Sequence, residues 1–245
     1  MTTEFDQYAT EYSKLLRDPL RDWFGATDMF FHLRKWLVIQ DLLNRQGLAP
    51  SKLKWLDVGC GQGQLLNLGC GSFKRAAGCD PSVQMIRSCT ARAVYSQPSP
   101  TELPFADASF DFLTAVCVYH HVHGGDRELL TKSVRRVLKP GGLFCLIEHN
   151  PWNPVTQLIV RRCPIDEDAE LLSMRQVTTL MQGGGFTVLD SSYFLYLTER
   201  LFDRFGKSEN LLRRCPMGGQ FAVLARKPGG VDEPSLTKTT LSSSL

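Results

Sequence analysis

The stretch LDVGCGQG, residues 56–63, connects an expected β-strand to the start of a helix. Its glycines stand at alternate positions, so the chain can turn sharply and its backbone can approach a ligand that a Cβ atom would exclude. The free N–H groups of the following helix face the same crevice. The spacing is GxGxG after an acid, Asp57, whereas a dinucleotide-binding turn reads GxGxxG. A pyrophosphate cradle is therefore the weaker interpretation.

A second acid ends the next expected strand, in GCDPS, residues 78–82. Asp80 in this stretch could accept hydrogen bonds from both hydroxyls of a ribose through its two carboxylate oxygens. Pro81 then turns the chain into a helix that contains Met85. The helix after the glycine turn should have only about one and a half turns, because GCG, residues 69–71, follows it directly.

Short apolar runs alternate with helical patterns along the rest of the chain, as in a mainly parallel sheet covered on both faces. The runs predict strands over residues 53–58, 76–79, 93–96, 110–118, 143–148, 186–193 and 220–225. Helical patterns separate them over 83–92, 127–138 and 173–182. A polar, charged segment joins the last two strands, and the last strand is expected to run antiparallel. The fold class is therefore α/β.

Composition excludes several classes of protein. Hydrophobic residues make up 43% of the 245 and charged residues 22%, which excludes a wholly disordered or fibrous chain. The net charge of +3 is too small to predict nucleic-acid binding. The eight cysteines form no CxxC pair, which favours reduced thiols in a cytoplasmic protein. The sequence shows neither a signal-peptide core nor a long apolar run, so we expect neither secretion nor a membrane span.

Four stretches in order, LDVGCGQG, GCDPS, LPFADASFDFL (103–113) and RRVLKPGGLF (135–144), resemble the successive signatures of class I S-adenosylmethionine-dependent methyltransferases. The resemblance covers a little over a third of the chain. It implies a Rossmann-like, seven-stranded, mainly parallel sheet flanked by helices, and S-adenosyl-L-methionine as the cofactor.

The resemblance also implies roles for individual residues around the cofactor. The glycines would cradle its amino-acid portion beside Asp57, and Asp80 would hold the ribose. Pro81, Met85, Leu103 and Pro104 would enclose the adenine, and two residues would lie near the sulfonium. The complete set is Asp57, Gly59, Gly61, Gly63, Asp80, Pro81, Met85, Leu103, Pro104, Cys117 and His121.

One departure from the family pattern concerns the adenine. The family usually places an acid and then a small residue shortly before LPF, the acid to accept from the adenine amino group and the small residue to donate a backbone N–H. Here these positions hold Ser99 and Pro100, and proline has no N–H. Either Thr101 takes over this role, or affinity for the cofactor is reduced.

The chain divides into an N-terminal helical cover or lid (1–50), a class I methyltransferase domain (51–227) and a flexible tail (228–245). Aromatic residues recur at helical spacing in the cover up to a stop near Gly25, and a second helix is expected from Asp28 as its cap to Asn44. The cover could close over the cofactor as a lid, or it could be an amphipathic cover helix.

Methyl transfer is a direct displacement, so the protein must align the acceptor and, for a hydroxyl acceptor, remove its proton. The candidate bases are four histidines, of which His121 and His149 are favoured because each follows the end of an expected strand. Both could instead be packing residues. The histidines show no helix-face pair, so no metal site is predicted. Tyr12 and Trp152 are the candidate acceptor contacts.

We therefore expect methyl transfer to a small-molecule acceptor, with neither a membrane nor a nucleic acid as partner. Three alternatives stay open. VYHHVHGGDRELL, residues 118–130, faintly resembles a group of tRNA wobble-uridine methyltransferases. The protein could also be a binding or scaffold protein that has this fold but no catalytic activity, or it could be a dehydrogenase. The acceptor, its reacting atom and the oligomeric state do not follow from the sequence.

Overall fold

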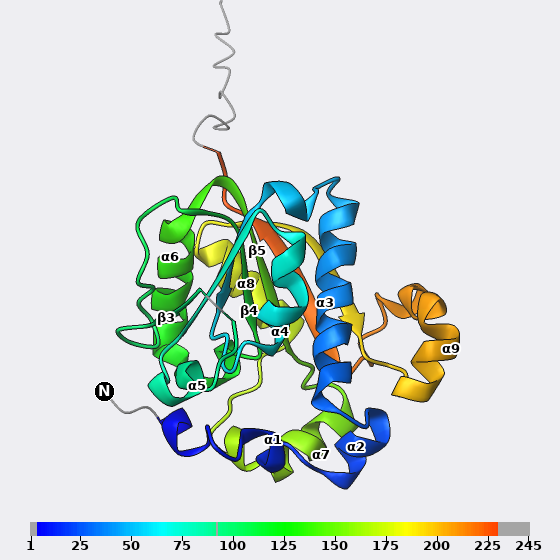
Figure 1. Ribbon diagram of the computed structural model, residues 1–245. Helices are drawn as coiled ribbons and strands as arrows, with labels where there is room; N and C mark the ends of the chain where they lie inside the picture. The colour runs from blue at the N-terminus through cyan, green and yellow to red at the C-terminus, as the bar shows by residue number, and fades with distance from the viewer. Residues whose placement is uncertain (1–3, 92, 230–245) are drawn as a thin grey trace, which may run out of the picture.

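A computed structural model describes residues 4–91 and 93–229 (Figure 1). One seven-stranded sheet has the order β3-β2-β1-β4-β5-β7-β6. Strands β1 to β5 pair in parallel, and β7 lies antiparallel between β5 and β6. The strands are β1 (Lys54–Val58), β2 (Arg75–Asp80), β3 (Val94–Ser96), β4 (Phe110–Val116), β5 (Leu138–His149), β6 (Thr187–Phe194) and β7 (Gln220–Arg226). Every predicted strand is present, and the antiparallel last strand is confirmed.

Helices cover both faces of the sheet, as Figure 1 shows. One face carries α3 (Asp28–Arg45) and α4 (Gln64–Gly69), and the other carries α6 (Arg127–Val137) and α8 (Met174–Gly183). Successive strand residues point to opposite faces, so the chain's apolar runs supply two cores. Trp55 packs with the α3 side and Leu56 with the α6 side. The α4 helix is as short as the glycines after it predict.

The N-terminal fifty residues form shorter helices than their aromatic spacing suggests. They are the 3-10 turn η1 (Glu4–Gln7), α1 (Tyr12–Leu15) and α2 (Pro19–Phe24), followed by α3. Pro19 starts α2 because it lacks an N–H, and the Asp18 carboxylate accepts from the next two backbone N–H groups. Thr27, not Asp28, is the residue preceding α3. Figure 1 shows α1, α2 and α7 (Pro154–Arg162) gathered at one end of the sheet.

Several predicted boundaries were wrong. The helix expected over 83–92 is α5 (Val83–Arg87), and its expected end at Arg92 lies outside the described residues. Strand β4 stops at Val116 because Cys117 takes a left-handed φ of 56°. The polar segment between the last strands contains α9 (Glu199–Glu209). Of the tail expected over 228–245, all but the first two residues lie outside the described part.

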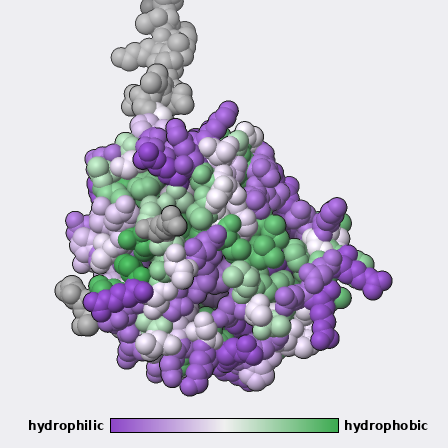
Figure 2. All heavy atoms as spheres, in the orientation of Figure 1, coloured by the Kyte–Doolittle hydropathy of each residue, from purple (hydrophilic) through white to green (hydrophobic). Residues whose placement is uncertain are grey.

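Most of the surface in Figure 2 is hydrophilic, with apolar side chains exposed over α3. Next to that helix, a groove of about 840 Å³ lies between α3, β6 and α9. It is lined by none of the side chains predicted to bind the cofactor or the acceptor. In the described part of the chain, no helix has the length and apolar character needed to cross a bilayer.

Candidate active site

The glycine turn lies at the carboxyl ends of β1 and β2. The backbone N–H groups of Gly59 and Cys60 both donate to the Cys79 carbonyl, at 2.8 and 3.0 Å, so the turn is tied to β2. A Cβ atom on Gly59 would lie 2.5 Å from the Val118 side chain. At Gly61, with φ +52°, a Cβ atom would meet nothing within 4 Å. The turn therefore packs closely on the protein at Gly59 and leaves open space for a ligand at Gly61.

The Asp80 carboxylate is buried at the end of β2 and is held by the backbone on both sides. One oxygen accepts from the Gly61 N–H and the other from the Ser82 N–H, each at 2.8 Å. Burial raises the pKa of Asp80 to about 6, although these hydrogen bonds partly offset the rise. Each oxygen keeps acceptor capacity for a hydroxyl, so the geometry fits the predicted contact with a ribose.

Charges of both signs lie near the glycine turn. Asp57 is buried and accepts a 2.6 Å hydrogen bond from the Thr114 hydroxyl. Burial raises the pKa of Asp57 to about 7, while the ammonium of Lys35, a buried residue of α3, acts to lower it. Sequence reasoning missed Lys35, because a single lysine in an amphipathic helix looks like a surface residue. The pair offers an anion and a cation to the amino-acid end of a zwitterionic ligand.

The residues predicted to enclose the adenine differ in exposure. Met85 and Leu103 are buried, whereas Pro104 is exposed. Gln97, which follows β3, was not predicted: its side chain is 5% exposed, and its side-chain oxygen Oε1 has no hydrogen-bond partner among the described residues. Its backbone N–H donates to the Asp80 carbonyl at 3.0 Å, so Gln97 lies beside the expected ribose position.

The first described residues lie across the crevice. The Asp6 carboxylate accepts from the Ser82 hydroxyl at 2.7 Å, next to Asp80. On the other side, the ring of Phe5 lies 4.9 Å from that of His121, centroid to centroid and edge to face. The Ala9 carbonyl accepts from the Gln62 side chain of the glycine turn at 2.8 Å. These contacts span the crevice, and the function of the segment as a lid or as a fixed cover stays a prediction.

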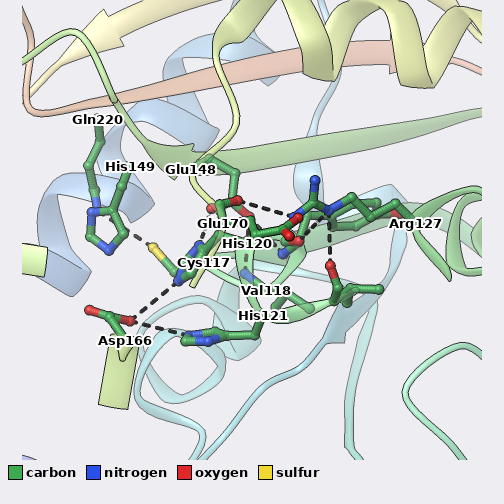
Figure 3. A network of polar contacts seen from close by, with 12 residues as sticks. Cys117, Val118, His120, His121, Arg127, Glu148, His149, Asp166, Glu170 and Gln220 are labelled. Atoms are coloured by element: carbon green, nitrogen blue, oxygen red, sulfur yellow. Dashed lines mark hydrogen bonds and ion pairs between the residues drawn. The ribbon is translucent and has the colours of Figure 1, made fainter. Parts of the chain in front are cut away.

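A histidine cluster lies beside the crevice, where β4 and β5 end (Figure 3). His120 is buried, and its Nδ1 is hydrogen-bonded to Oε2 of the Glu148 carboxylate. His121 Nε2 lies 3.4 Å from Oδ1 of Asp166. The His149 ring lies 5.2 Å from that of His120. The structure thus brings both favoured histidines together and adds two carboxylates that sequence reasoning did not single out.

The cluster is electrostatically coupled. Burial alone would lower the pKa of His120, but the Glu148 and Asp166 carboxylates raise it to about 10. Burial, reinforced by the charge of His120, lowers the pKa of His121 to about 3. Burial would raise the pKa of the Cys117 thiol, but Lys35 and His149 bring it down to about 7. The role of His121 or His149 as a base stays a prediction.

The two candidate acceptor residues lie in different settings. Tyr12 is half-buried, and burial together with the charge of nearby Asp166 raises the pKa of its hydroxyl. Asp166 of the histidine cluster is thus one of the charges near the Tyr12 hydroxyl. Trp152 is 67% exposed, so it does not pack in the core. Its loop is rigid nonetheless, since the Asn150 amide donates to the carbonyls of Pro216 and Gly218 at 2.9 and 2.7 Å. A place for Trp152 in an acceptor pocket stays a prediction.

Comparison with known proteins agrees with this geometry. The family described as "Methyltransferase domain" matches residues 56–146, from β1 into β5. A methyltransferase of Synechocystis sp. is 29% identical over 156 residues, which are 60% of this chain and 72% of the relative. An O-methyltransferase of Penicillium expansum is 28% identical over 201 residues, 71% of this chain and 70% of the relative.

Solved structures share the fold. A SAM-dependent methyltransferase of Thermotoga maritima, described as a possible histamine N-methyltransferase, superimposes with a TM-score of 0.65. The two share 18% identity, and the match covers 91% of this chain and 98% of that one. The strand order, the glycine turn with its two acids and the matched region lead to one conclusion: residues 56–146 match the methyltransferase domain, and the fold is that of class I S-adenosylmethionine-dependent methyltransferases.

Proposed function

We propose that this protein transfers the methyl group of S-adenosyl-L-methionine to a small-molecule acceptor. The observation that carries the proposal is the covered crevice. The contacts of Phe5, Asp6 and Ala9 support a position of the N-terminal segment over the carboxyl ends of the strands, next to the histidine cluster. A covered crevice suits an acceptor that the protein can enclose, because enclosure excludes water and holds the acceptor in line with the methyl group.

The crevice fits the cofactor at three points. The open space at Gly61 admits a ligand, the Asp80 carboxylate suits two ribose hydroxyls, and Asp57 with Lys35 complements an amino-acid zwitterion. The side-chain oxygen of Gln97, which none of the described residues contacts with a hydrogen bond, would accept from the adenine amino group, in place of the acid that the family has near Ser99. Bound there, S-adenosyl-L-methionine supplies an electrophilic methyl group.

The protein itself must bind and orient the acceptor and, for a hydroxyl acceptor, remove its proton. The histidine cluster lies at the carboxyl ends of β4 and β5, where ligands of open α/β sheets bind. The half-buried Tyr12 lies on the same side and would form part of the acceptor's wall. Because several titratable groups converge here, the cluster is the place where an acceptor proton would be taken up.

RNA methyl transfer is the second candidate, and one relative favours it. A probable tRNA methyltransferase of Homo sapiens is 29% identical over 139 residues, although these are only 29% of that protein's length. The covered crevice and the small net charge of +3 weigh against RNA, which binds through extended basic surfaces.

Two measurements test the proposal. In calorimetry, S-adenosylhomocysteine should bind the wild-type chain. It should bind at least about tenfold more weakly to Asp80→Asn, because the charged acceptor of two hydroxyls is lost. The exposed control Asp203→Asn should bind it as the wild type does. No binding to the wild type would leave only a scaffold role.

The second measurement identifies the acceptor class. The chain is incubated with methyl-labelled cofactor and cell extract, and the extract is then separated into small molecules, RNA and protein. Label in the small-molecule fraction, lost in Asp80→Asn, supports the proposal. Label confined to RNA would overturn it in favour of the second candidate.

A further inference from the structure

Beside the cofactor crevice, three side chains direct their ligand atoms at one another. His120 and His121 lie in η4 (Tyr119–His121), directly after β4, and Asp166 ends η6 (Pro164–Asp166) after α7. The Asp166 Oδ1 atom lies 3.6 Å from His120 Nε2 and 3.4 Å from His121 Nε2, and the three atoms all lie within 4.8 Å of one another. Figure 3 shows the Asp166 carboxylate facing both imidazoles.

These separations match metal ligation better than hydrogen bonding. An N–H···O hydrogen bond is usually 2.7–3.2 Å long, so contacts of 3.4 and 3.6 Å are poor ones. Around a tetrahedral zinc ion with ligands at about 2.1 Å, neighbouring ligand atoms lie roughly 3.4 Å apart. A divalent cation between these atoms would therefore need little rearrangement of Asp166 relative to the two histidines.

The surroundings of His120 prepare one of its nitrogens for a metal. Nδ1 is hydrogen-bonded to Glu148 Oε2, and Glu148 Oε1 is itself fixed by the backbone N–H groups of Val118 and Tyr119 at 3.1 and 2.7 Å. A metal ion that displaces the Nε2 proton of the imidazolium would leave the other proton on Nδ1, facing Glu148, and would be bound by the Nε2 lone pair. That Nε2 is buried and has no hydrogen-bond partner among the described residues. A carboxylate behind a histidine is the usual support of a metal-bound imidazole.

We propose that His120 Nε2, His121 Nε2 and Asp166 Oδ1 bind a divalent transition metal ion, with Zn²⁺ as the best match. Two imidazoles and one carboxylate are the donor set of catalytic rather than structural zinc sites, which keep a position open. The ion would also offset the two negative charges that Glu148 and Asp166 bring into this buried region. Histidine spacing alone does not predict the site, because Asp166 comes from a distant segment.

The open position gives the ion a role in the methyl transfer proposed above, and this role rests on that proposal. A hydroxyl acceptor whose oxygen occupies the open position would have a lowered pKa, and its proton would pass to water. The oxygen would then attack the methyl carbon while the bond from carbon to sulfur breaks with its electron pair remaining on sulfur. The products are a methyl ether and S-adenosylhomocysteine. Metal binding itself requires no acceptor.

Binding is tested on the full chain with Zn²⁺ and Co²⁺ alone, titrated in competition with a chelating dye. We expect one equivalent to bind, and at least about tenfold weaker binding to His121→Ala and to Asp166→Asn. The matched control is His123→Ala, an exposed histidine that contributes nothing to the cluster. Circular dichroism checks that each variant is folded, and His121 is the safer position because it is only half-buried.

Eight free thiols could bind zinc elsewhere, so the Co²⁺ spectrum decides where the ion lies. Tetrahedral Co²⁺ bands without a thiolate charge-transfer band support the His–His–Asp site. A thiolate band, equal affinity in Asp166→Asn, or no stoichiometric binding would overturn it. S-adenosylhomocysteine binding to the wild type is measured in parallel. Metal binding without S-adenosylhomocysteine binding would refute the proposed function. S-adenosylhomocysteine binding without metal binding would refute only the metal site.

Discussion

The ring of Phe5 lies edge-to-face on the imidazole of His121, with 4.9 Å between the ring centroids and an angle of 82° between the planes. One residue belongs to the N-terminal segment and the other to the turn after β4, so the contact joins two sides of the crevice. The Asp6 contact with Ser82 ties the same segment to the ribose side. We therefore predict that these contacts must break before a bound cofactor leaves.

Phe5→Ala should accordingly speed the dissociation of S-adenosylhomocysteine. An aromatic pair contributes about 0.5–1.5 kcal/mol beyond its area, so we expect a rate increase of roughly twofold to tenfold, measured by stopped-flow fluorescence. Phe205→Ala on the exposed side of α9 is the control. An unchanged dissociation rate in Phe5→Ala would show that the segment is only a cover.

Gln97→Leu should weaken cofactor binding through the adenine alone. The side-chain oxygen Oε1 of Gln97 is buried and has no partner in the part of the chain that the structure describes, and we expect it to accept from the adenine amino group. Losing one such bond costs about 1 kcal/mol, or roughly a fivefold loss in affinity. The inosine analogue of S-adenosylhomocysteine lacks the amino group, so the wild type should discriminate against it and Gln97→Leu should not. If both proteins discriminate equally, Gln97 does not contact the adenine.

The strands could be predicted because parallel strands buried on both faces read as continuous apolar runs. The glycine turn and its acids could be predicted because their chemistry is local: Gly61 and Asp80 follow adjacent strands and meet through a 2.8 Å hydrogen bond. Helix ends were less predictable, since Pro19 divides an apolar pattern that otherwise looks continuous.

The histidine cluster could be predicted only in part. His121 and His149 follow strands and were found by that position. Asp166 and Lys35 reach the site from distant segments, and no local pattern distinguishes them from surface charges. Glu148 did carry a signal, because an acid inside a buried apolar strand needs a partner, and His120 is that partner.

Asp57 should make the ligand-free protein less stable as the pH rises. Burial raises its pKa in the folded chain to about 7 from an ordinary value of 3.8, so the folded state holds the proton more tightly than the unfolded state. The resulting stability is present at acid pH and is lost as the pH rises through about 4 to 7, by up to about 1.4 kcal/mol per pH unit.

Urea unfolding of the wild type and of Asp57→Asn across this range measures the effect. The amide keeps an oxygen for the Thr114 hydroxyl but carries no charge. The free energy of unfolding of the variant, minus that of the wild type, should therefore increase as the pH rises. The exposed control Asp203→Asn should follow the wild type. Parallel curves for the wild type and Asp57→Asn would mean that Asp57 titrates normally.

Glu209→Ala should destabilise the attachment of α9 to α3. The Arg34 guanidinium is buried, pairs with Glu209 and lies 3.6 Å from the centroid of the Phe202 ring. Glu209 also accepts from the backbone N–H of Tyr196 at 2.8 Å. Removing the carboxylate leaves a buried cation without its anion, which costs roughly 3–5 kcal/mol in the free energy of unfolding.

The exposed ion pair of Lys14 and Glu11 provides the comparison, because Glu11→Ala should cost less than about 1 kcal/mol. Urea unfolding measures both changes. Arg34→Met combined with Glu209→Ala should recover much of the loss, since neither an unpaired cation nor an unpaired anion then stays buried. A loss in Glu209→Ala as small as that in Glu11→Ala would show that water reaches Arg34 and that α9 is held by its apolar contacts alone.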